Sequence, residues 1–358
     1  MEETKTHRST HPLDTTHSQR FDLSNPSDAV AFDLHLSTQG YAIVANAANA
    51  KQIQHSTNLF WDWLESTPNT TTLSRHDPST WVSTKEHPWI PNPNNGLLSY
   101  VGQSDFCWSI RTLPVVKQAF QRIWKDSTSN NSEEMIVSFS GGCVFRPWRR
   151  NQTFLTQGEW WHLDQNGTID GNTGKQCVQG LVSLTDATVH TGGLCVLPGS
   201  HHQFVDVCKR SPFEDGESDY MSIGRDDELL QPTASTPTVG KLICCKAGDL
   251  IVWDSRLVHC NTPASTDVVL QNLSEHPHTE SEDRELIRLV GYVCMVPRNF
   301  ATNAEIKQRI ECYETKTQTS HWPHRHLRPI GFGTLDYDNC SAERKELIGR
   351  VSEGPNET

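Results

Sequence analysis

No part of this sequence carries a long apolar run, a secretory leader or an extended basic cluster. No stretch approaches the roughly 18 apolar residues that a membrane-spanning helix needs. The polar segment at residues 1–20 also lacks the apolar core of a secretory signal. These absences predict a cytoplasmic protein that does not bind a membrane, and they leave its oligomeric state open.

Cysteine pairs with the CxxC spacing are also missing. The chain has 11 cysteines, an odd number, and they are scattered without any CxxC spacing. This pattern indicates neither a disulfide framework nor a structural zinc site. We therefore expect most cysteines to be reduced and buried as small apolar side chains.

Positive charge is scarce relative to negative charge. Lys and Arg together number 31 and Asp and Glu number 43, so the net charge is −12. Such a surface repels the phosphates of nucleic acids and of anionic lipids. The one compact basic segment, RPWRR at residues 146–150, is too short for a nucleic-acid footprint. We expect no nucleic-acid partner.

The two ends of the chain differ in composition from its middle. Residues 1–25 are polar and rich in Thr, Ser and His, which predicts a disordered tail, and residues 336–358 are assigned to a C-terminal tail. Between them we find no internal repeat and no Gly-, Ser- or Pro-rich linker. The sequence therefore predicts one domain over residues 26–335.

Helical periodicity marks the beginning and the end of this domain. Residues 66–104, by contrast, are rich in Pro, Asn, Ser and Thr, which predicts a long irregular loop with buried tryptophans. A short helix is expected to begin near Ser27 and to be followed by a strand at residues 41–44. Further helices are expected at residues 50–66, 113–126 and 303–316.

Short apolar or alternating runs dominate the chain from about residue 135 to about residue 300. Gly, Pro, Asn and Asp turns separate them, and no helical pattern lies between consecutive runs. This arrangement favours an all-β sandwich or barrel over a parallel α/β sheet. A jelly roll of two facing sheets satisfies the number of strands.

The segment GEWWHLDQNG, residues 158–167, carries the first candidate site. In an extended strand, residues two apart point to the same face, so His162 and Asp164 project together. They are two of the three ligands of the 2-His-1-carboxylate set that holds non-haem Fe(II). We assign the third ligand to His259, which can reach the pair only if the sheet folds back on itself.

Four motifs follow one another in the β-rich region: HLDQN, GGLCVLPGSHHQF, GDLIVWDSRLVHCNTPA and IRLVGYVCMVPR. Over roughly residues 135–300 they resemble the phytanoyl-CoA dioxygenase family of Fe(II)- and 2-oxoglutarate-dependent oxygenases. The resemblance implies a mainly β fold, a double-stranded β-helix of the jelly-roll, cupin-like kind, with flanking N-terminal helices. It also implies that His162, Asp164 and His259 bind Fe(II).

The same resemblance implies a site for the cosubstrate. Family members bind the distal carboxylate of 2-oxoglutarate with an arginine on the strand after the distal histidine, because a guanidinium matches a carboxylate with two hydrogen bonds. Here an inserted polar stretch at residues 264–285 precedes that strand. We assign Arg288 and Asn261 to 2-oxoglutarate, with Arg284 and Arg298 as the alternatives to Arg288.

The reaction that this resemblance implies uses O2 to convert 2-oxoglutarate into succinate and CO2 while a small or medium-sized organic substrate is hydroxylated. An aspartate ligand favours hydroxylation, because related halogenases leave that position to halide. Two alternatives are a cupin-like metalloprotein that works without 2-oxoglutarate and a non-catalytic binding or sensing module on the same barrel.

Several segments offer side chains to a small-molecule substrate. Residues 102–114 mix polar side chains with aromatic ones and are expected to form a loop, and the RPWRR segment could bind an anionic group. The His-rich segment at residues 321–326 lacks a closed metal-binding spacing and is interpreted as a packed loop. The predicted substrate pocket contains Gln103, Arg111, Arg146, Trp160, Gln165 and Trp253.

Overall fold

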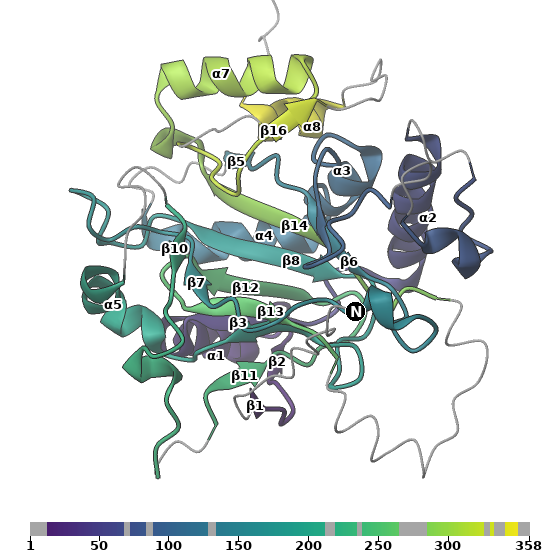
Figure 1. The fold of residues 1–358 in the computed structure, drawn as a ribbon. Helices are drawn as coiled ribbons and strands as arrows, with labels where there is room; N and C mark the ends of the chain where they lie inside the picture. The colour runs from purple at the N-terminus through teal and green to yellow at the C-terminus, as the bar shows by residue number, and fades with distance from the viewer. Residues whose placement is uncertain are drawn as a thin grey trace, which may run out of the picture.

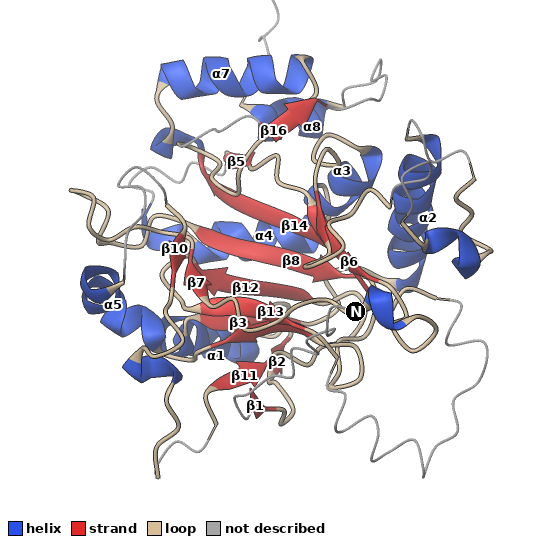
Figure 2. Ribbon diagram, viewed as in Figure 1, coloured by secondary structure: helices blue, strands red, loops and turns tan. Residues whose placement is uncertain are grey.

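The computed structural model places β-strands at the centre of the molecule and helices around them (Figure 1, Figure 2). In the ranges that it describes, no helix is long and apolar enough to cross a membrane. The described residues are 13–67, 72–83, 89–127, 134–211, 219–234, 238–264, 285–325, 330–332 and 341–349.

The first sheet carries the strands expected around the metal site. Its six strands lie in the order β1-β11-β9-β13-β7-β10. In that order they span Leu13–Asp14, Gly240–Leu242, Gly193–Val196, His259–Thr262, His162–Leu163 and Met221–Ser222.

The second sheet is larger and forms the support on which the helices pack. Its order is β2-β3-β12-β8-β14-β6-β4, and β5 pairs with β14. A separate pair, β15 and β16, lies near the C-terminal end. The strands are Arg20–Phe21 (β2), Tyr41–Val44 (β3), Leu97–Leu98 (β4), Met135–Val137 (β5), Gly142–Phe145 (β6), Val178–Ser183 (β8), Leu250–Asp254 (β12), Arg288–Pro297 (β14), Thr317–Gln318 (β15) and Ile330–Phe332 (β16).

Helix boundaries follow local capping. Asn25 caps α1 and Pro26 occupies its first turn, where a missing N–H costs nothing, while Gly40 ends the helix in the left-handed conformation. Asn49 and Gln52 form a capping box at the start of α2. The helices are Pro26–Gln39 (α1), Ala50–Ser66 (α2), Asp105–Arg111 (α3), Pro114–Ile123 (α4), Phe204–Arg210 (α5), Asn303–Glu314 (α7) and Ala342–Ile348 (α8).

Alternation along β12 shows how the layers are stacked. Leu250 and Val252 belong to the core shared with the N-terminal helices. Ile251 and Trp253 point to the other face and pack in a second core that includes Leu194 of β9. Because residues two apart in a strand share a face, one face of the large sheet meets the helices and the other meets the small sheet. The predicted mainly β architecture with N-terminal helices is therefore confirmed, and the space between the sheets is where the site lies.

Three local expectations differ from the structure. Part of the expected tail over residues 1–25 is paired, because β1 adds to β11 and β2 adds to β3. The C-terminal segment expected as a tail contains α8, whose Leu347 and Ile348 are buried. The expected loop over residues 102–114 contains α3, because Ser104 caps a helix with a buried apolar face.

Candidate metal centre

Two neighbouring strands of the small sheet bring the three predicted metal ligands together. β13 pairs antiparallel with β7 so that His259 lies opposite His162, and Asp164 follows directly after β7. His259 Nε2 lies 3.3 Å from Asp164 Oδ2, and His162 Nε2 lies 3.7 Å from Asp164 Oδ1. One ligand atom from each residue lies within 4.8 Å of the other two. This donor set fits non-haem Fe(II).

The orientation of both imidazoles is set by backbone carbonyls. His162 Nδ1 lies 3.0 Å from the carbonyl oxygen of Trp160, and His259 Nδ1 lies 2.9 Å from that of Leu257. Because a carbonyl oxygen only accepts, we infer that each Nδ1 carries the hydrogen. Each Nε2 then presents a lone pair toward Asp164, as a neutral histidine ligand requires.

Electrostatics keep the histidine of β7 neutral. Burial lowers the pKa of His162 to about 4, and the neighbouring imidazole of His259 adds to the effect. Only 4% of His162 and 5% of His259 is exposed. A neutral imidazole at neutral pH is the form that binds a metal ion.

The carboxylate of Asp164 is ionised and fixed. Burial alone would raise its pKa, but the neighbouring imidazoles of His321, His162 and His259 hold that pKa well below its usual value. Gln179 of β8 donates from Nε2 to Asp164 Oδ2 at 2.7 Å. Gln179 therefore restrains the rotation of a charged metal ligand.

A cavity of about 240 Å³ adjoins these three residues. Side chains of both sheets line it, so it lies in the space between them. Two predicted substrate residues, Trp160 and Trp253, are on its wall, as is Asn261. The other lining residues are Leu97, Ser140, His162, Asp164, Gln179, Gly180, Leu181, Leu194, Tyr220, His259, Cys260, Tyr292, Cys294 and His321.

Arg288, the first residue of β14, is buried at 3% exposure. Its Nη2 lies 3.4 Å from Asn261 Oδ1, on the cavity wall, and its guanidinium lies over the ring of Phe145. Its Nε has no hydrogen-bond partner, and no carboxylate pairs with Arg288 in the described part of the chain. A buried guanidinium of this kind is an anion site that the protein itself does not fill.

Gly193 of β9 makes room for this guanidinium. Its φ of +153° is one that residues with a side chain rarely adopt, and a Cβ built there would overlap Nη1 of Arg288. The missing side chain of Gly193 therefore leaves the space that the predicted cosubstrate arginine occupies.

The two alternative arginines do not share this environment. Arg298 follows the far end of β14, ten residues from Arg288, and lies 4.0 Å from a carboxylate oxygen of Glu134. Arg284 lies outside the described residues. Among the described candidates, Arg288 alone touches the wall of the cavity.

Four predicted substrate residues do not reach the cavity. They are buried, and their N–H groups donate to backbone carbonyls, because a buried donor needs a hydrogen-bond acceptor. Arg111 donates to the carbonyls of Gly102 and Ser140, and Arg146 donates to that of Trp81. Gln103 donates to the carbonyl of Thr317, and Gln165 donates to those of Asn172 and Gly174.

Several cavity residues were not assigned to the site from the sequence, among them Gln179, Tyr220, Tyr292 and His321. The alternation of β8 and β14 was a usable signal for Gln179 and Tyr292, because each lies an even number of residues from another inward side chain. Tyr220 stacks on His162 with 4.9 Å between ring centroids. No motif or spacing connects Tyr220 to the site. The His-rich segment was interpreted as a packed loop, and the structure places its first residue, His321, on the cavity wall.

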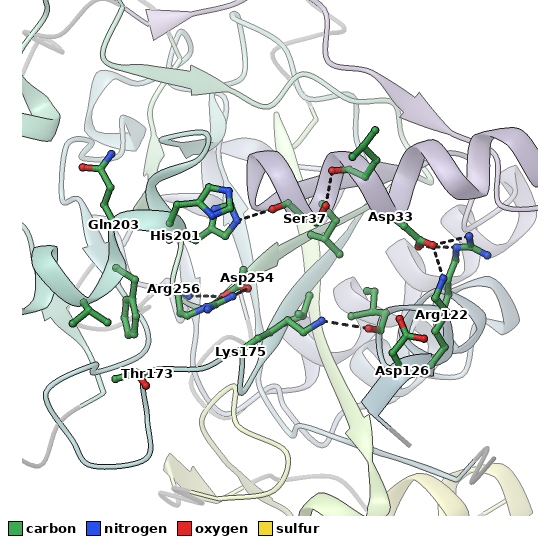
Figure 3. A pocket seen from close by; sticks show the side chains of 18 of the residues that line it. Asp33, Ser37, Arg122, Asp126, Thr173, Lys175, His201, Gln203, Asp254 and Arg256 are labelled. Carbon is green, nitrogen blue, oxygen red and sulfur yellow. Dashed lines mark hydrogen bonds and ion pairs between the residues drawn. The ribbon is translucent and has the colours of Figure 1, made fainter. Parts of the chain in front are cut away.

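A larger cavity, with a volume of about 810 Å³, lies elsewhere, between α1 and α5 (Figure 3). Its charged side chains are largely paired with each other: Arg122 and Lys125 with Asp33, and Arg256 with Asp254. His201 in its wall is not directed at the metal site, because its Nε2 lies 3.1 Å from the carbonyl of Ser37. We place the chemistry at the smaller cavity.

Two facing sheets around a buried 2-His-1-carboxylate set define the class of non-haem iron oxygenases. The model of the phytanoyl-CoA dioxygenase (PhyH) family matches residues 37–268, which is more than half of the chain. The chain belongs to this family. The predicted family is thus confirmed, and with it Fe(II) and 2-oxoglutarate as the cofactor and cosubstrate that the site must accommodate.

Relatives extend over most of the chain. Ava biosynthesis cluster protein O of Aspergillus versicolor is 26% identical over 302 residues, covering 82% of this chain and 85% of that protein. The solved structure of SnoN, a non-haem α-ketoglutarate-dependent epimerase from nogalamycin biosynthesis, is 14% identical, covers 76% of this chain and 85% of SnoN, and superposes with a TM-score of 0.46. EvdO2 of Micromonospora carbonacea var. aurantiaca, solved with 2-oxoglutarate, is 15% identical, covers 74% of this chain and 89% of EvdO2, and gives a TM-score of 0.43.

Proposed function

We propose that this protein is an Fe(II)- and 2-oxoglutarate-dependent dioxygenase that hydroxylates a small or medium-sized organic substrate and releases succinate and CO2. The observation that carries the proposal is a pair of neighbouring features: a 2-His-1-carboxylate set that lines the cavity, and a buried guanidinium that contacts the cavity residue Asn261 and has no carboxylate partner in the described chain. The first suits iron, and the second suits a dicarboxylic cosubstrate.

In this proposal His162, Asp164 and His259 hold Fe(II), with Gln179 keeping the carboxylate in place. Arg288 binds the distal carboxylate of 2-oxoglutarate, and Asn261 orients the guanidinium from the cavity wall. We also propose that the two sheets form the double-stranded β-helix expected from the sequence. Support comes from their face-to-face packing, with β7 and β13 placing the ligands between them.

The iron and cosubstrate together supply the activation of O2, and the chain supplies position and exclusion of water. Trp160 and Trp253 place large apolar surfaces beside the ligand histidines, with 4.8 Å and 5.6 Å between the ring centroids of each pair. Such walls limit access of water to the reacting atoms. Asp164 would supply a carboxylate ligand to the iron, whereas related halogenases leave that position to halide, which is why hydroxylation is proposed.

Succinate release tests the proposal. Purified protein with Fe(II), 2-oxoglutarate and O2 should release succinate, and His162→Ala and His259→Ala should abolish it. His202→Ala is the matched control, because this exposed histidine hydrogen-bonds a carbonyl of α1 outside the cavity. Full succinate release by both ligand variants would overturn the proposal.

The cupin-like alternative makes a different prediction. An enzyme that does not use 2-oxoglutarate has no need of Arg288 for that cosubstrate. If 2-oxoglutarate turnover survives Arg288→Ala at unchanged apparent affinity, the cosubstrate assignment fails even though the metal site stands. A non-catalytic module would bind the metal and release no succinate under any condition.

A further inference from the structure

The iron-site cavity opens on the side of Tyr220. This residue is 47% exposed and yet lines the cavity, so it lies at the mouth. It precedes β10, the edge strand that pairs with β7, and its ring stacks on His162 at 4.9 Å. Trp160 also stacks on His162, with 4.8 Å between centroids and 10° between planes. Flat aromatic surfaces therefore border the path to the metal ligands.

Three nitrogen-bearing rings that are not metal ligands lie on the cavity wall with the ligand set. Trp160 lies against His162, Trp253 lies against His259, and His321 lines the same cavity as Asp164. Trp160 Nε1, Trp253 Nε1 and His321 Nε2 are buried, and none of them has a hydrogen-bond partner among the described residues. Unpaired buried nitrogens are costly, so a bound molecule that offers acceptor atoms gains by approaching them.

Charge is nearly absent from the same walls. No lysine, arginine or glutamate of the described chain lines the cavity, and its one aspartate is the metal ligand Asp164. Arg288, behind Asn261, is assigned to the cosubstrate, so a charged group on the substrate would lose its hydration without finding a further counter-ion. The part of the substrate that enters is therefore neutral.

Size adds a further restriction. Binding pockets for small molecules usually span about 300–1,000 Å³, whereas this cavity has about 240 Å³ and must also accept the cosubstrate. The reacting end of the substrate enters, and the remainder lies over the mouth, against Tyr220 and Trp160. Planar rings suit this position because they stack on indole and phenol faces.

We propose that the substrate is a neutral, planar, ring-containing molecule with a carbonyl or hydroxyl oxygen, and that His321 is a positioning residue that hydrogen-bonds this oxygen. The assignment rests on the proposed function of the same site. It gives a role to His321, which comes from the segment after β15 and closes the cavity from a part of the chain far from the ligands in sequence.

Three probes test the substrate class by anaerobic calorimetry on protein loaded with Fe(II) and 2-oxoglutarate. They are 2-phenyl-4-quinolone, the same compound carrying a carboxylate on its phenyl ring, and the saturated ketone 2-decalone. We expect the neutral quinolone to bind at least about tenfold more tightly than either other probe. Equal or tighter binding of the carboxylated or the saturated probe, or no binding of the quinolone, overturns the assignment.

Variants of His321 test its role on the same loaded protein. His321→Ala should weaken quinolone binding about five- to tenfold, since one hydrogen bond is lost, and should leave the affinity for 2-oxoglutarate unchanged. His321→Gln should recover part of the loss because its amide can also donate, and His202→Ala should change nothing. Unchanged quinolone affinity in His321→Ala overturns the positioning role.

The loading step separates the two proposals. If wild-type protein does not take up Fe(II) and 2-oxoglutarate together, the proposed function itself fails before any probe is added. If it loads and then shows the wrong preference among the probes, the proposed function stands and the substrate assignment is overturned.

Discussion

Replacing Arg288 with methionine should weaken the binding of 2-oxoglutarate without lowering the free energy of unfolding of the ligand-free protein. The side chain is 3% exposed, its Nε is unpaired, and its Nη2 lies 3.4 Å from Asn261 Oδ1. A pair of charge-assisted hydrogen bonds to a carboxylate contributes about 3 kcal/mol or more. Arg288→Met should therefore weaken 2-oxoglutarate binding at least about 100-fold.

The same substitution removes a buried charge that has no carboxylate partner within the described residues. Methionine has a comparable length and can fill the space against Phe145. Because a buried unpaired charge opposes folding, the free energy of unfolding of the ligand-free variant should be equal to or higher than that of wild type. Urea unfolding at neutral pH measures this difference, and calorimetric titration of 2-oxoglutarate measures the affinity.

Two other arginines provide the comparison. Arg298→Met changes the far end of the same strand and should leave the affinity for 2-oxoglutarate unchanged. Arg309 is equally buried but donates to the carbonyls of Ile348, Pro323, Val137 and Leu347, so Arg309→Met should lower the free energy of unfolding by about 3 kcal/mol or more. Unchanged 2-oxoglutarate affinity in Arg288→Met, or a loss of stability like that of Arg309→Met, would refute the reasoning.

Three further predictions follow from the same contacts. Gly193→Ala should displace the guanidinium of Arg288 and weaken 2-oxoglutarate binding about tenfold, and wild-type affinity would contradict this. Gln179→Leu should weaken Fe(II) binding about 10- to 100-fold in a metal titration, because Asp164 loses its 2.7 Å hydrogen bond. The pKa of His162 is about 4 in the folded protein and 6.5 in the unfolded chain, so the unfolded chain binds more protons as the pH falls. The free energy of unfolding of the metal-free protein should therefore decrease by about 2 kcal/mol between pH 7 and pH 5. His162→Gln should flatten that part of the curve measured by urea unfolding, and an unaltered slope would refute the assignment.

The parts of the site that the sequence predicts are those governed by local periodicity or by a family motif. His162 and Asp164 lie two apart, so one strand segment directs both, and His259 begins a strand whose register with β7 places it opposite His162. The mainly β fold is predicted for the same reason, since short alternating runs admit few other arrangements.

The remaining site residues depend on packing between segments that are distant in sequence. Tyr220 and His321 reach the cavity from a strand edge and from a C-terminal segment, and no spacing in the chain indicates either contact. Arg111 and Arg146 illustrate the opposite case. Their charge suggested contact with a ligand, but in the structure both donate to backbone carbonyls outside the cavity lining.

The most direct test of the central claim is an anaerobic titration of the purified protein with Fe(II) and 2-oxoglutarate, followed by visible absorption. If His162, Asp164 and His259 hold iron and Arg288 holds the cosubstrate, a weak charge-transfer band of the chelated cosubstrate should appear in wild type and disappear in His162→Ala. Absence of the band in wild type, or its persistence in His162→Ala, would contradict the account.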